Sequence, residues 1–521
     1  MKLNIQDTFN VVLKNDADET NQVRMVKDAH FSFVTPVVPK QPSLVHASLD
    51  LASSLGISIE DIHTKEFLDI FSGTSIRKNT RPYAMCYGGH QFGHWAGQLG
   101  DGRAINLFEV VEEGKRWTLQ LKGAGKTPYS RSGDGLAVLR SSIREHLCSE
   151  AMHALGVPTT RSLSLMLTGD NVLRDILYNG HPAYEKGAIL CRVAPSFLRF
   201  GNFQILAARQ ELENLQMLAD YTIKYFFPHI TTTTNEKYVQ FFQEVADKNL
   251  DMMIHWQRVG FVHGVMNTDN MSIHGLTIDY GPYGWLDSFD PEWTPNTTDK
   301  EHRRYRFGNQ PDITYWNILQ LANAIYPLVK NAAPFEEILQ SFEKNFEQRY
   351  MHMYRQKLGL KVEHEDDYLL VDSLNKVMLL TETDMTLFFR TLSTVKKGQS
   401  SEQVLIDFMH VFYQPEAIIG DIKSAWEEWF NNYLGRLSIE HLDDNERMKD
   451  MHQMNPKYVL RTYMAQLAIE SAENGDYSLL NELYLLLQNP YDEQPDMEKW
   501  YVKRPDWAKE KIGCSMLSCS S

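Results

Sequence analysis

Cysteine is scarce in this chain of 521 residues, which contains five, at 86, 148, 191, 514 and 519. A sparse and odd set in a large chain does not build a disulfide framework and is typical of a reducing compartment. We therefore expect a cytoplasmic protein with free thiols. The exception is the tail, where Cys514 and Cys519 are close together in a small, polar segment that we expect to be mobile.

Basic runs and long apolar runs are also missing. Lys and Arg total 52 against 67 Asp and Glu, so the formal net charge is −15. An acidic chain without a basic stripe is a poor match for nucleic acid or an anionic membrane surface. No apolar run approaches the roughly 20 residues of a membrane span, and residues 1–10 resemble neither a signal peptide nor a presequence. We expect a monomer without nucleic-acid or membrane partners, in which functional arginines belong to one local site.

Four regions differ in the periodicity of their apolar residues, and together they predict an α+β fold. Residues 1–75 are expected to be an extension packed on the main body, with a short helix over 44–55. Residues 76–203 predict a strand-rich lobe with a hairpin over 104–122 and a helix over 137–155. Residues 204–490 predict a helical lobe, and residues 491–521 a tail.

Two features of the strand-rich region are typical of phosphate binding. Glycine is dense between residues 88 and 102, and glycines let a backbone approach a phosphate. Lys122 ends a strand next to Gly-Ala-Gly, where a kinase-like fold grips phosphates, and Glu145 on the following helix could hold it. The alternatives are tight turns, a solvated lysine and a surface glutamate. His90 and His94 lack a carboxylate or cysteine partner nearby, which favours a structural role over metal binding.

A loop and a predicted hairpin between His263 and Gly284 could hold a metal ion. Asn270 and Asp279 flank a turn at residues 274–275 and offer the oxygen ligands that Mg²⁺ prefers. Asp269 is then free to act as a base. The alternative is an ordinary loop, since Asn and Asp are common in turns.

Arginines at 192 and 199 flank a proline turn, which indicates either an anion partner or a buried salt bridge. The stretch after Asp279, up to residue 311, is rich in aromatic residues and arginines. A loop this long is more often functional than structural.

The order of these parts is that of a protein kinase: glycine loop, strand lysine, helix glutamate, catalytic loop, metal-binding aspartate. One kinase rule fails. The kinase base lies two residues after the loop histidine and five before the asparagine, and that position is Val265 here. Asp269 is the only carboxylate left in the loop, so the site either is inactive or carries out different chemistry.

The chain resembles the selenoprotein O (YdiU) family of kinase-like protein nucleotidyltransferases. The resemblance rests on motifs spread over roughly residues 81–317, namely Tyr87-Gly-Gly-His-Gln-Phe-Gly, Gln98-Leu-Gly-Asp-Gly-Arg103, Gln120-Leu-Lys-Gly-Ala-Gly-Lys-Thr-Pro-Tyr-Ser-Arg131, Gly133-Asp-Gly, Arg140-Ser-Ser-Ile-Arg-Glu145, His263-Gly-Val-Met-Asn-Thr-Asp-Asn270 and Asp279-Tyr-Gly-Pro. It implies a two-lobed, protein-kinase-like fold. The implied activity is transfer of AMP from ATP to Ser, Thr or Tyr hydroxyls of proteins, with release of pyrophosphate, and UMP transfer from UTP is also ascribed to the family.

The resemblance also implies roles for individual residues. ATP is flipped relative to a kinase, so that its α-phosphate faces the acceptor. Asp269 is then the general base, Asn270 and Asp279 hold Mg²⁺ or Mn²⁺, and Glu145 supports Lys122. The implied nucleotide-binding residues are Gly100, Gly102, Arg103, Lys122, Asp134, Gly135, Arg192, Arg199 and Asp279.

Two other functions and one regulatory hypothesis stay open at this point. A kinase-like phosphotransferase would use Asp269 as base, and a pseudokinase scaffold would not catalyse. Eukaryotic members of the family carry selenocysteine third from the end, where this chain has Cys519. A redox latch between Cys519 and Cys514, or a partner's thiol, is therefore a further hypothesis.

Overall fold

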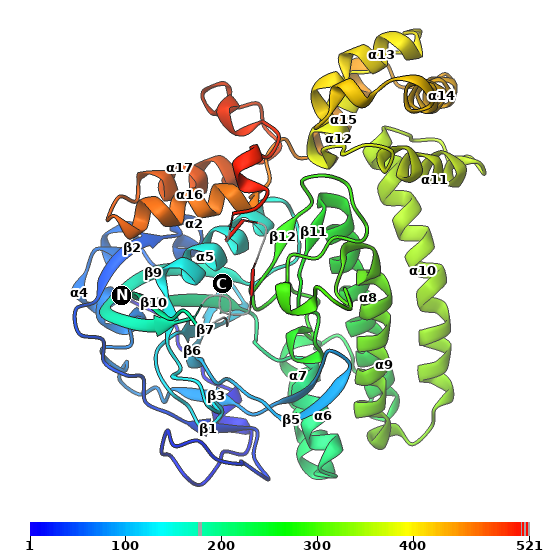
Figure 1. The fold of residues 1–521 in the computed structure, drawn as a ribbon. Coiled ribbons are helices and arrows are strands. Elements are labelled where there is room, and N and C mark those ends of the chain that lie inside the picture. Colours follow the sequence, from blue (N-terminus) through cyan, green and yellow to red (C-terminus); the bar gives the residue numbers. More distant parts are fainter. Residues whose placement is uncertain (176–179, 512, 515–516, 519–521) are drawn as a thin grey trace.

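The computed structural model describes residues 1–175, 180–511, 513–514 and 517–518. Within them, all strands of the main antiparallel sheet lie in the first 194 residues, and helices take up most of the remainder (Figure 1). The strands of this main sheet pair in the order β1-β3-β6-β7-β10-β9-β2, with β8 also paired to β10. Their bounds are β1 Phe31–Phe33, β2 Ser43–Ala47, β3 Tyr83–Met85, β6 Ala104–Glu112, β7 Lys115–Lys122, β8 Ala137–Val138, β9 Arg161–Arg174 and β10 Ala183–Ala194.

The predicted hairpin over 104–122 is confirmed as strands β6 and β7. Its turn contains Glu113 (φ 49°) and Gly114 (φ 75°), both left-handed, as a two-residue hairpin turn that follows the sheet's twist requires. The register pairs Lys122 with Ala104 on one side and with Leu190 of β10 on the other. The lysine is therefore held at the end of a central strand.

The predicted helix over 44–55 is half wrong. Residues 43–47 form β2, an edge strand paired with β9, and only Leu49–Ser54 are helical (α2). Ser48 separates the two, because its side chain accepts a hydrogen bond from the Leu51 N–H and so caps the helix. With β1 at the opposite edge, residues before 75 supply both outer strands of the main sheet.

The helix predicted over 137–155 is confirmed as α5, and the region from residue 204 onward, predicted to be helical, contains α8, which Gly260 ends in a left-handed conformation. No helix in the described ranges is long and apolar enough to cross a membrane. The bounds are α1 Phe9–Val12, α2 Leu49–Ser54, α3 Ile59–Ile62, α4 Lys65–Phe71, α5 Leu139–Ala154, α6 Phe200–Ala208, α7 Leu212–Phe226, α8 Glu236–Val259, α9 Gln310–Val329, α10 Ala333–Leu358, α11 Asp367–Met378, α12 Met385–Leu392, α13 Ser401–Asp407, α14 Gly420–Leu437, α15 Asp444–Met454, α16 Thr462–Glu473 and α17 Ser478–Gln488.

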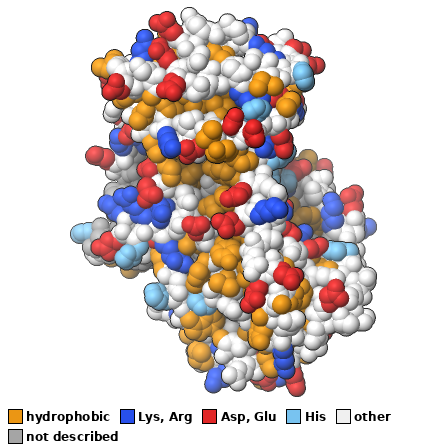
Figure 2. Space-filling view, turned by 90° about the vertical axis from the view of Figure 1, so that its right-hand side faces the viewer, with side chains coloured by type: hydrophobic (Ala, Val, Ile, Leu, Met, Phe, Trp, Pro, Cys, Tyr) orange, Lys and Arg blue, Asp and Glu red, His pale blue; other side chains and the backbone are white. Residues whose placement is uncertain are grey.

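The C-terminal helices do not all lie together. Helices α11 to α15 form a separate group at the top of Figure 1, whereas α16 and α17 return to the sheet-bearing part and pack on α5. Seen from the side of α10, hydrophobic side chains gather between the upper group and the remainder of the molecule (Figure 2). Because α16 and α17 pack on α5, the helix that carries Glu145 is covered by segments more than 300 residues away in sequence.

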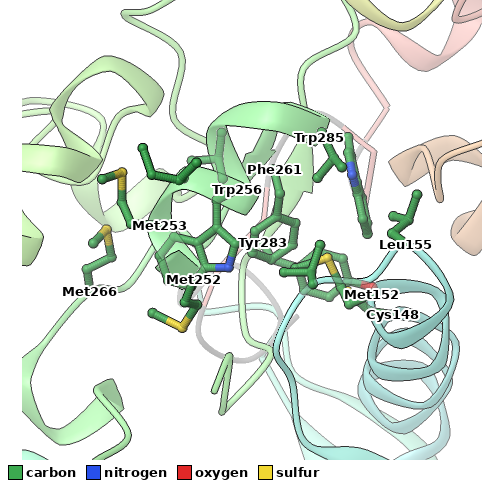
Figure 3. Close-up of a cluster of buried hydrophobic side chains, with 14 of the residues drawn as sticks. Cys148, Met152, Leu155, Met252, Met253, Trp256, Phe261, Met266, Tyr283 and Trp285 are labelled. Carbon is green, nitrogen blue, oxygen red and sulfur yellow. The ribbon is translucent and has the colours of Figure 1, made fainter. Parts of the chain in front are cut away.

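A buried aromatic cluster joins α5 to the end of α8 (Figure 3). Phe261 lies 5.0 Å from Trp285 and 5.8 Å from Tyr283 between ring centroids, and Trp256 of α8 lies beside them, tilted against Phe261. Cys148 and Met152 of α5, and Leu155 directly after its end, face this cluster. Because close-packed interiors move as one body, this contact fixes α5 relative to the loop that follows Phe261.

Candidate functional site

A single cleft of about 830 Å³ brings the predicted site residues together. Its walls come from the glycine-rich segment before β6, the end of β7, the loop over 130–136, β10, the start of α6 and the segments around 265–270 and 279–282. Every predicted nucleotide-binding, metal-binding and catalytic residue lines it: Gly100, Gly102, Arg103, Lys122, Asp134, Gly135, Arg192, Arg199, Asp269, Asn270 and Asp279.

Lys122 and Glu145 form an ion pair at the floor of this cleft. The Lys122 side chain is 13% exposed and that of Glu145 3%, so the interpretations as a solvated lysine and a surface glutamate are wrong. Burial lowers the pKa of Lys122, and the carboxylate of Glu145 opposes that shift. Glu145 also accepts a hydrogen bond from Arg192 at 3.2 Å, which makes it the common partner of two cleft cations.

Asp279 lies between two buried arginines. Arg192 and Arg199 each place a guanidinium nitrogen 2.5 Å from a different oxygen of its carboxylate. Burial raises the pKa of Asp279, but Arg199, Arg192 and Lys122 outweigh burial and hold it well below its ordinary value. Asp279 has a left-handed backbone (φ 57°), which is uncommon for a residue other than glycine. Of the two alternatives for these arginines, the structure shows the buried salt bridge. Both arginines also line the cleft, so an anion there could reach them.

Asp269 lies in a short 3-10 turn (η1, Thr268–Asn270) and is 8% exposed. Its Oδ2 accepts a hydrogen bond from Gln91 at 3.3 Å, while Oδ1 has no partner among the described residues. A Cβ at Gly89 would come within 2.7 Å of Oδ1, so only glycine fits there. Burial raises the pKa of Asp269 to about 6, against the opposing effect of Arg199.

The predicted hairpin around His274 is wrong. Ser272 pairs with Arg199 and Thr277 with Thr159, so the two arms bind other segments instead of each other. His274 is half-buried and hydrogen-bonds the Ser196 hydroxyl at 2.7 Å. The prediction failed because both arms pair with the backbone of the strand-rich region, at Thr159 and Arg199, and the local sequence pattern does not reveal such distant partners. This exchange ties the turn to the segment that carries Arg199.

Asn270 and Asp279 form a chemically suitable donor pair for a divalent metal. The Asn270 amide nitrogen donates to the Val265 carbonyl at 2.9 Å, which leaves its amide oxygen free to act as a ligand. One amide oxygen and one carboxylate on the same cleft match the preference of Mg²⁺ and Mn²⁺ for oxygen ligands. Among the described residues, no group of three or more His, Cys, Asp or Glu forms a metal cluster.

Close packing of Tyr129 explains two of the predicted glycines. A Cβ at Gly100 would come within 2.4 Å of the Tyr129 ring, and one at Gly102 within 2.7 Å of the Tyr129 carbonyl oxygen. Gly100 is also left-handed, with φ 97°. Space for Tyr129 therefore requires glycine at both positions independently of any phosphate.

Asp101 and Arg174 line the cleft but were missed in the sequence. Asp101 is 2% exposed and accepts hydrogen bonds from the Met85 N–H at 2.9 Å and the Asn106 amide at 3.2 Å. Arg174 binds both oxygens of Asp134, at 2.7 and 2.8 Å. Asp101 lies inside a quoted motif, so that motif could have indicated it, whereas Arg174 stands at the end of a strand without any local signal.

Replacing Arg174 by alanine is expected to raise the KM for the nucleotide several-fold while kcat changes little. The bidentate pair fixes Asp134, and because the Asp134 side chain is 43% exposed, losing the pair should cost roughly 0.2–1 kcal/mol. Steady-state kinetics with varied nucleotide would measure this split. Arg174→Lys keeps the charge but cannot form the two-nitrogen fork, so it should behave like alanine if geometry matters and like wild type if charge alone does.

The expectation of an exposed, reactive Cys514 is wrong. Cys514 is 3% exposed, and burial raises its pKa to about 11, so its thiol is protonated at neutral pH. Nearby, the Thr297 N–H donates to the Leu517 carbonyl at 2.8 Å, which holds this part of the tail against the loop after Asp279. Cys519, the other half of the hypothesised latch, lies outside the described residues.

Cations that suit phosphates lie in this cleft next to oxygen donors that suit a metal, a combination typical of enzymes that act on nucleotides. The family model described as "Protein adenylyltransferase SelO" matches residues 15–488, and the chain belongs to that family. The resemblance noted in the sequence is thereby confirmed. The protein is a nucleotidyltransferase, and membership in the family implies ATP as its substrate.

Similar proteins named "Protein nucleotidyltransferase YdiU" cover the whole length of the chain. The relative from Flavobacterium johnsoniae is 62% identical over 519 residues, which is 100% of this chain and 99% of that protein. The relative from Rhodopirellula baltica is 49% identical over 536 residues, with the same two coverages. A third, from Azoarcus sp., is 50% identical over 510 residues and 98% of each chain.

Proposed function

We propose that the protein transfers AMP from ATP to Ser, Thr or Tyr hydroxyls of other proteins and releases pyrophosphate. The observation that supports this proposal best is the position of Asp269, a buried carboxylate with a raised pKa, in the same cleft as Lys122, Arg192 and Arg199. A base for an acceptor hydroxyl and cations for departing phosphates are the two needs of this reaction.

The proposed step is an in-line displacement at the α-phosphorus. The acceptor oxygen forms a bond to that phosphorus, and the bond from phosphorus to the oxygen bridging the α- and β-phosphates breaks. Pyrophosphate leaves with the bonding electron pair, and the hydroxyl proton passes to a carboxylate oxygen of Asp269. Lys122, Arg192 and Arg199 stabilise the charge that develops on pyrophosphate, because buried cations act in a medium of low polarity.

Arg192 and Arg199 must change partners for this role. Both are bound to Asp279 in this structure, and we infer that the phosphates take over these guanidinium groups when the nucleotide binds. Asn270 and Asp279 would then hold Mg²⁺ or Mn²⁺, which supplies neutralisation of phosphate charge when bound. Releasing Asp279 from the two arginines would leave the oxygens of its ionised carboxylate available to a metal ion.

Transfer of label from ATP tests the proposed function. The full-length protein, a divalent metal and an acceptor protein are incubated with ATP labelled at the α-phosphate and, separately, at the γ-phosphate. Protein-bound label from the α position alone supports AMP transfer. Label from the γ position would identify a kinase-like phosphotransferase, and no label from either would identify a pseudokinase scaffold. A parallel incubation with α-labelled UTP tests UMP transfer.

The rate of transfer should depend on pH through Asp269. A base must be ionised to accept a proton, and the pKa of Asp269 is raised to about 6. The kcat/KM for the acceptor is therefore expected to be constant above about pH 7 and to fall with unit slope below pH 6. A profile that stays flat down to pH 4.5 would show that the transfer does not require an ionised carboxylate with this pKa.

A further inference from the structure

A small hairpin outside the main sheet contacts the catalytic loop directly. Strands β4 (Gly88–Gln91) and β5 (His94–Gln98) pair only with each other. The His90 N–H donates to the Thr268 hydroxyl at 2.7 Å, and the Phe92 N–H donates to the Asn267 side-chain oxygen at 3.1 Å. Together with the bond from Gln91 to Asp269, these contacts hold the turn end of the hairpin against residues 267–269, which include the proposed general base.

The same hairpin also exposes an aromatic side chain to solvent. Phe92 and Gly93 form its turn in left-handed conformations, with φ of 50° and 86°. Trp95 is 40% exposed and lies 5.1 Å from the His90 ring between centroids, and His90 in turn lies 5.4 Å from Trp316. Trp95, His90 and Trp316 of α9 therefore form a row of tilted and edge-to-face rings, next to the contact of His90 with the catalytic loop. An exposed tryptophan that packs on a neighbouring ring is typical of protein-binding surfaces.

A basic segment adjoins the hairpin in this otherwise acidic protein. The Tyr305 hydroxyl donates to Asn267 at 2.6 Å and accepts from the Phe92 N–H at 3.0 Å, which places the segment against the turn. The Arg304 guanidinium lies 4.9 Å from the Trp316 ring centroid. Lys300 and Arg303 are exposed, and neither forms an ion pair within the described part of the chain. These two cations are therefore available to an acidic partner.

We propose that the β4–β5 hairpin and residues 300–304 form the docking surface for the acceptor protein and select an extended acidic segment that carries the hydroxyl. This proposal rests on the proposed function. In this proposal, Trp95 contributes apolar contact, and Lys300 and Arg303 attract carboxylates of the segment. The turn end of the hairpin, held by its bonds to residues 267–269, directs the hydroxyl toward Asp269. Charge complementarity at the edge of a binding surface increases the rate of encounter, and this increase becomes smaller as salt is added.

Two matched peptides test the proposal in the full-length protein. Each carries Ser, Thr and Tyr in an identical core, flanked by Glu and Asp in one peptide and by Lys in the other. Incorporation of label from α-labelled ATP gives kcat and KM for each peptide. We expect the acidic peptide to be preferred by about tenfold in kcat/KM at low salt, and the preference to shrink as salt is added.

Arg303→Glu should abolish or reverse this preference, and Trp95→Ala should raise the KM for both peptides roughly tenfold. The KM for ATP should not change in either variant, because neither side chain lines the cleft. The matched controls are Lys115→Glu, at the exposed β6–β7 turn, and Trp507→Ala, which removes a tryptophan that is 46% exposed. Both controls should behave like wild type.

The outcomes separate the two proposals. Equal use of both peptides by wild type, or an unchanged preference in Arg303→Glu, overturns the docking surface while AMP transfer stands. The absence of α-label on either peptide and on any added protein overturns the proposed function itself. A rise in the KM for ATP in Trp95→Ala would also count against docking, since the substitution would then act on the cleft.

Discussion

Asp279→Ala is expected to reduce nucleotide transfer on the order of a thousandfold while nucleotide still binds without metal. A metal ion contributes several kcal/mol of charge stabilisation to such a reaction, and each 1.4 kcal/mol or so is a factor of ten in rate. Binding without metal should persist because the substitution frees Arg192 and Arg199, whose guanidinium groups are otherwise held by Asp279. Added metal should no longer strengthen binding.

Calorimetric titration of ATP into the variant, with and without Mn²⁺, measures the binding part of this prediction, and transfer of α-label measures the rate. The free energy of unfolding should fall by a few kcal/mol at most, because Arg192 keeps Glu145 and Gln120 as partners and Arg199 keeps the Asp269 carbonyl. Asp247→Ala is the control, since that residue pairs with Arg349 away from the cleft. A wild-type rate in Asp279→Ala would contradict the metal assignment.

The sequence predicted the local elements of the site well because their signals are local. The alternating pattern over 104–122 predicted the hairpin that positions Lys122, and the apolar stripe over 137–155 predicted the helix that carries Glu145. The quoted motifs predicted residues that all line one cleft. The roles of these residues in binding and catalysis remain predictions, which the experiments above address.

The errors arose where long-range pairing decided the structure. Residues 43–47 form a strand because β9 offers a free edge, and nothing in their own sequence indicates that edge. The turn at His274 exchanges its partners with residues 159 and 199. Cys514 is buried, although the polar composition of the tail predicted exposure. In the first two cases the pairing partners are distant in sequence, so the local pattern does not reveal them.

The Lys–Glu pair and the Arg–Asp–Arg cluster illustrate why residue roles are harder to predict than residue positions. Arg192 contacts Gln120, Glu145 and Asp279 at once, so its charge both supports the floor of the cleft and occupies a predicted metal ligand. A sequence motif identifies such a residue but not its partners. The structure adds the pairing of both arginines with Asp279, which no motif contained.

Asp269→Asn is expected to lower kcat by about 10²–10⁴-fold while the affinity for nucleotide stays within a few-fold of wild type. The amide keeps the size of the side chain and its contact with Gln91, but it cannot accept a proton from the acceptor hydroxyl. The neighbouring Gly89 leaves no space for a larger replacement. Residual transfer should also lose its dependence on pH near 6, because the titrating group is gone.

The pH dependence separates a base from a binding residue. If Asp269 only positions the nucleotide, the variant should show a raised KM for ATP and an unchanged kcat, and the fall in rate below pH 6 should remain. If Asp269 is the base, kcat falls, KM for ATP stays, and the acid limb disappears. Asn267 is a suitable control position in the same loop, because its side chain binds Tyr305 and the Phe92 N–H; Asn267→Ala should disturb acceptor binding but keep the acid limb near pH 6.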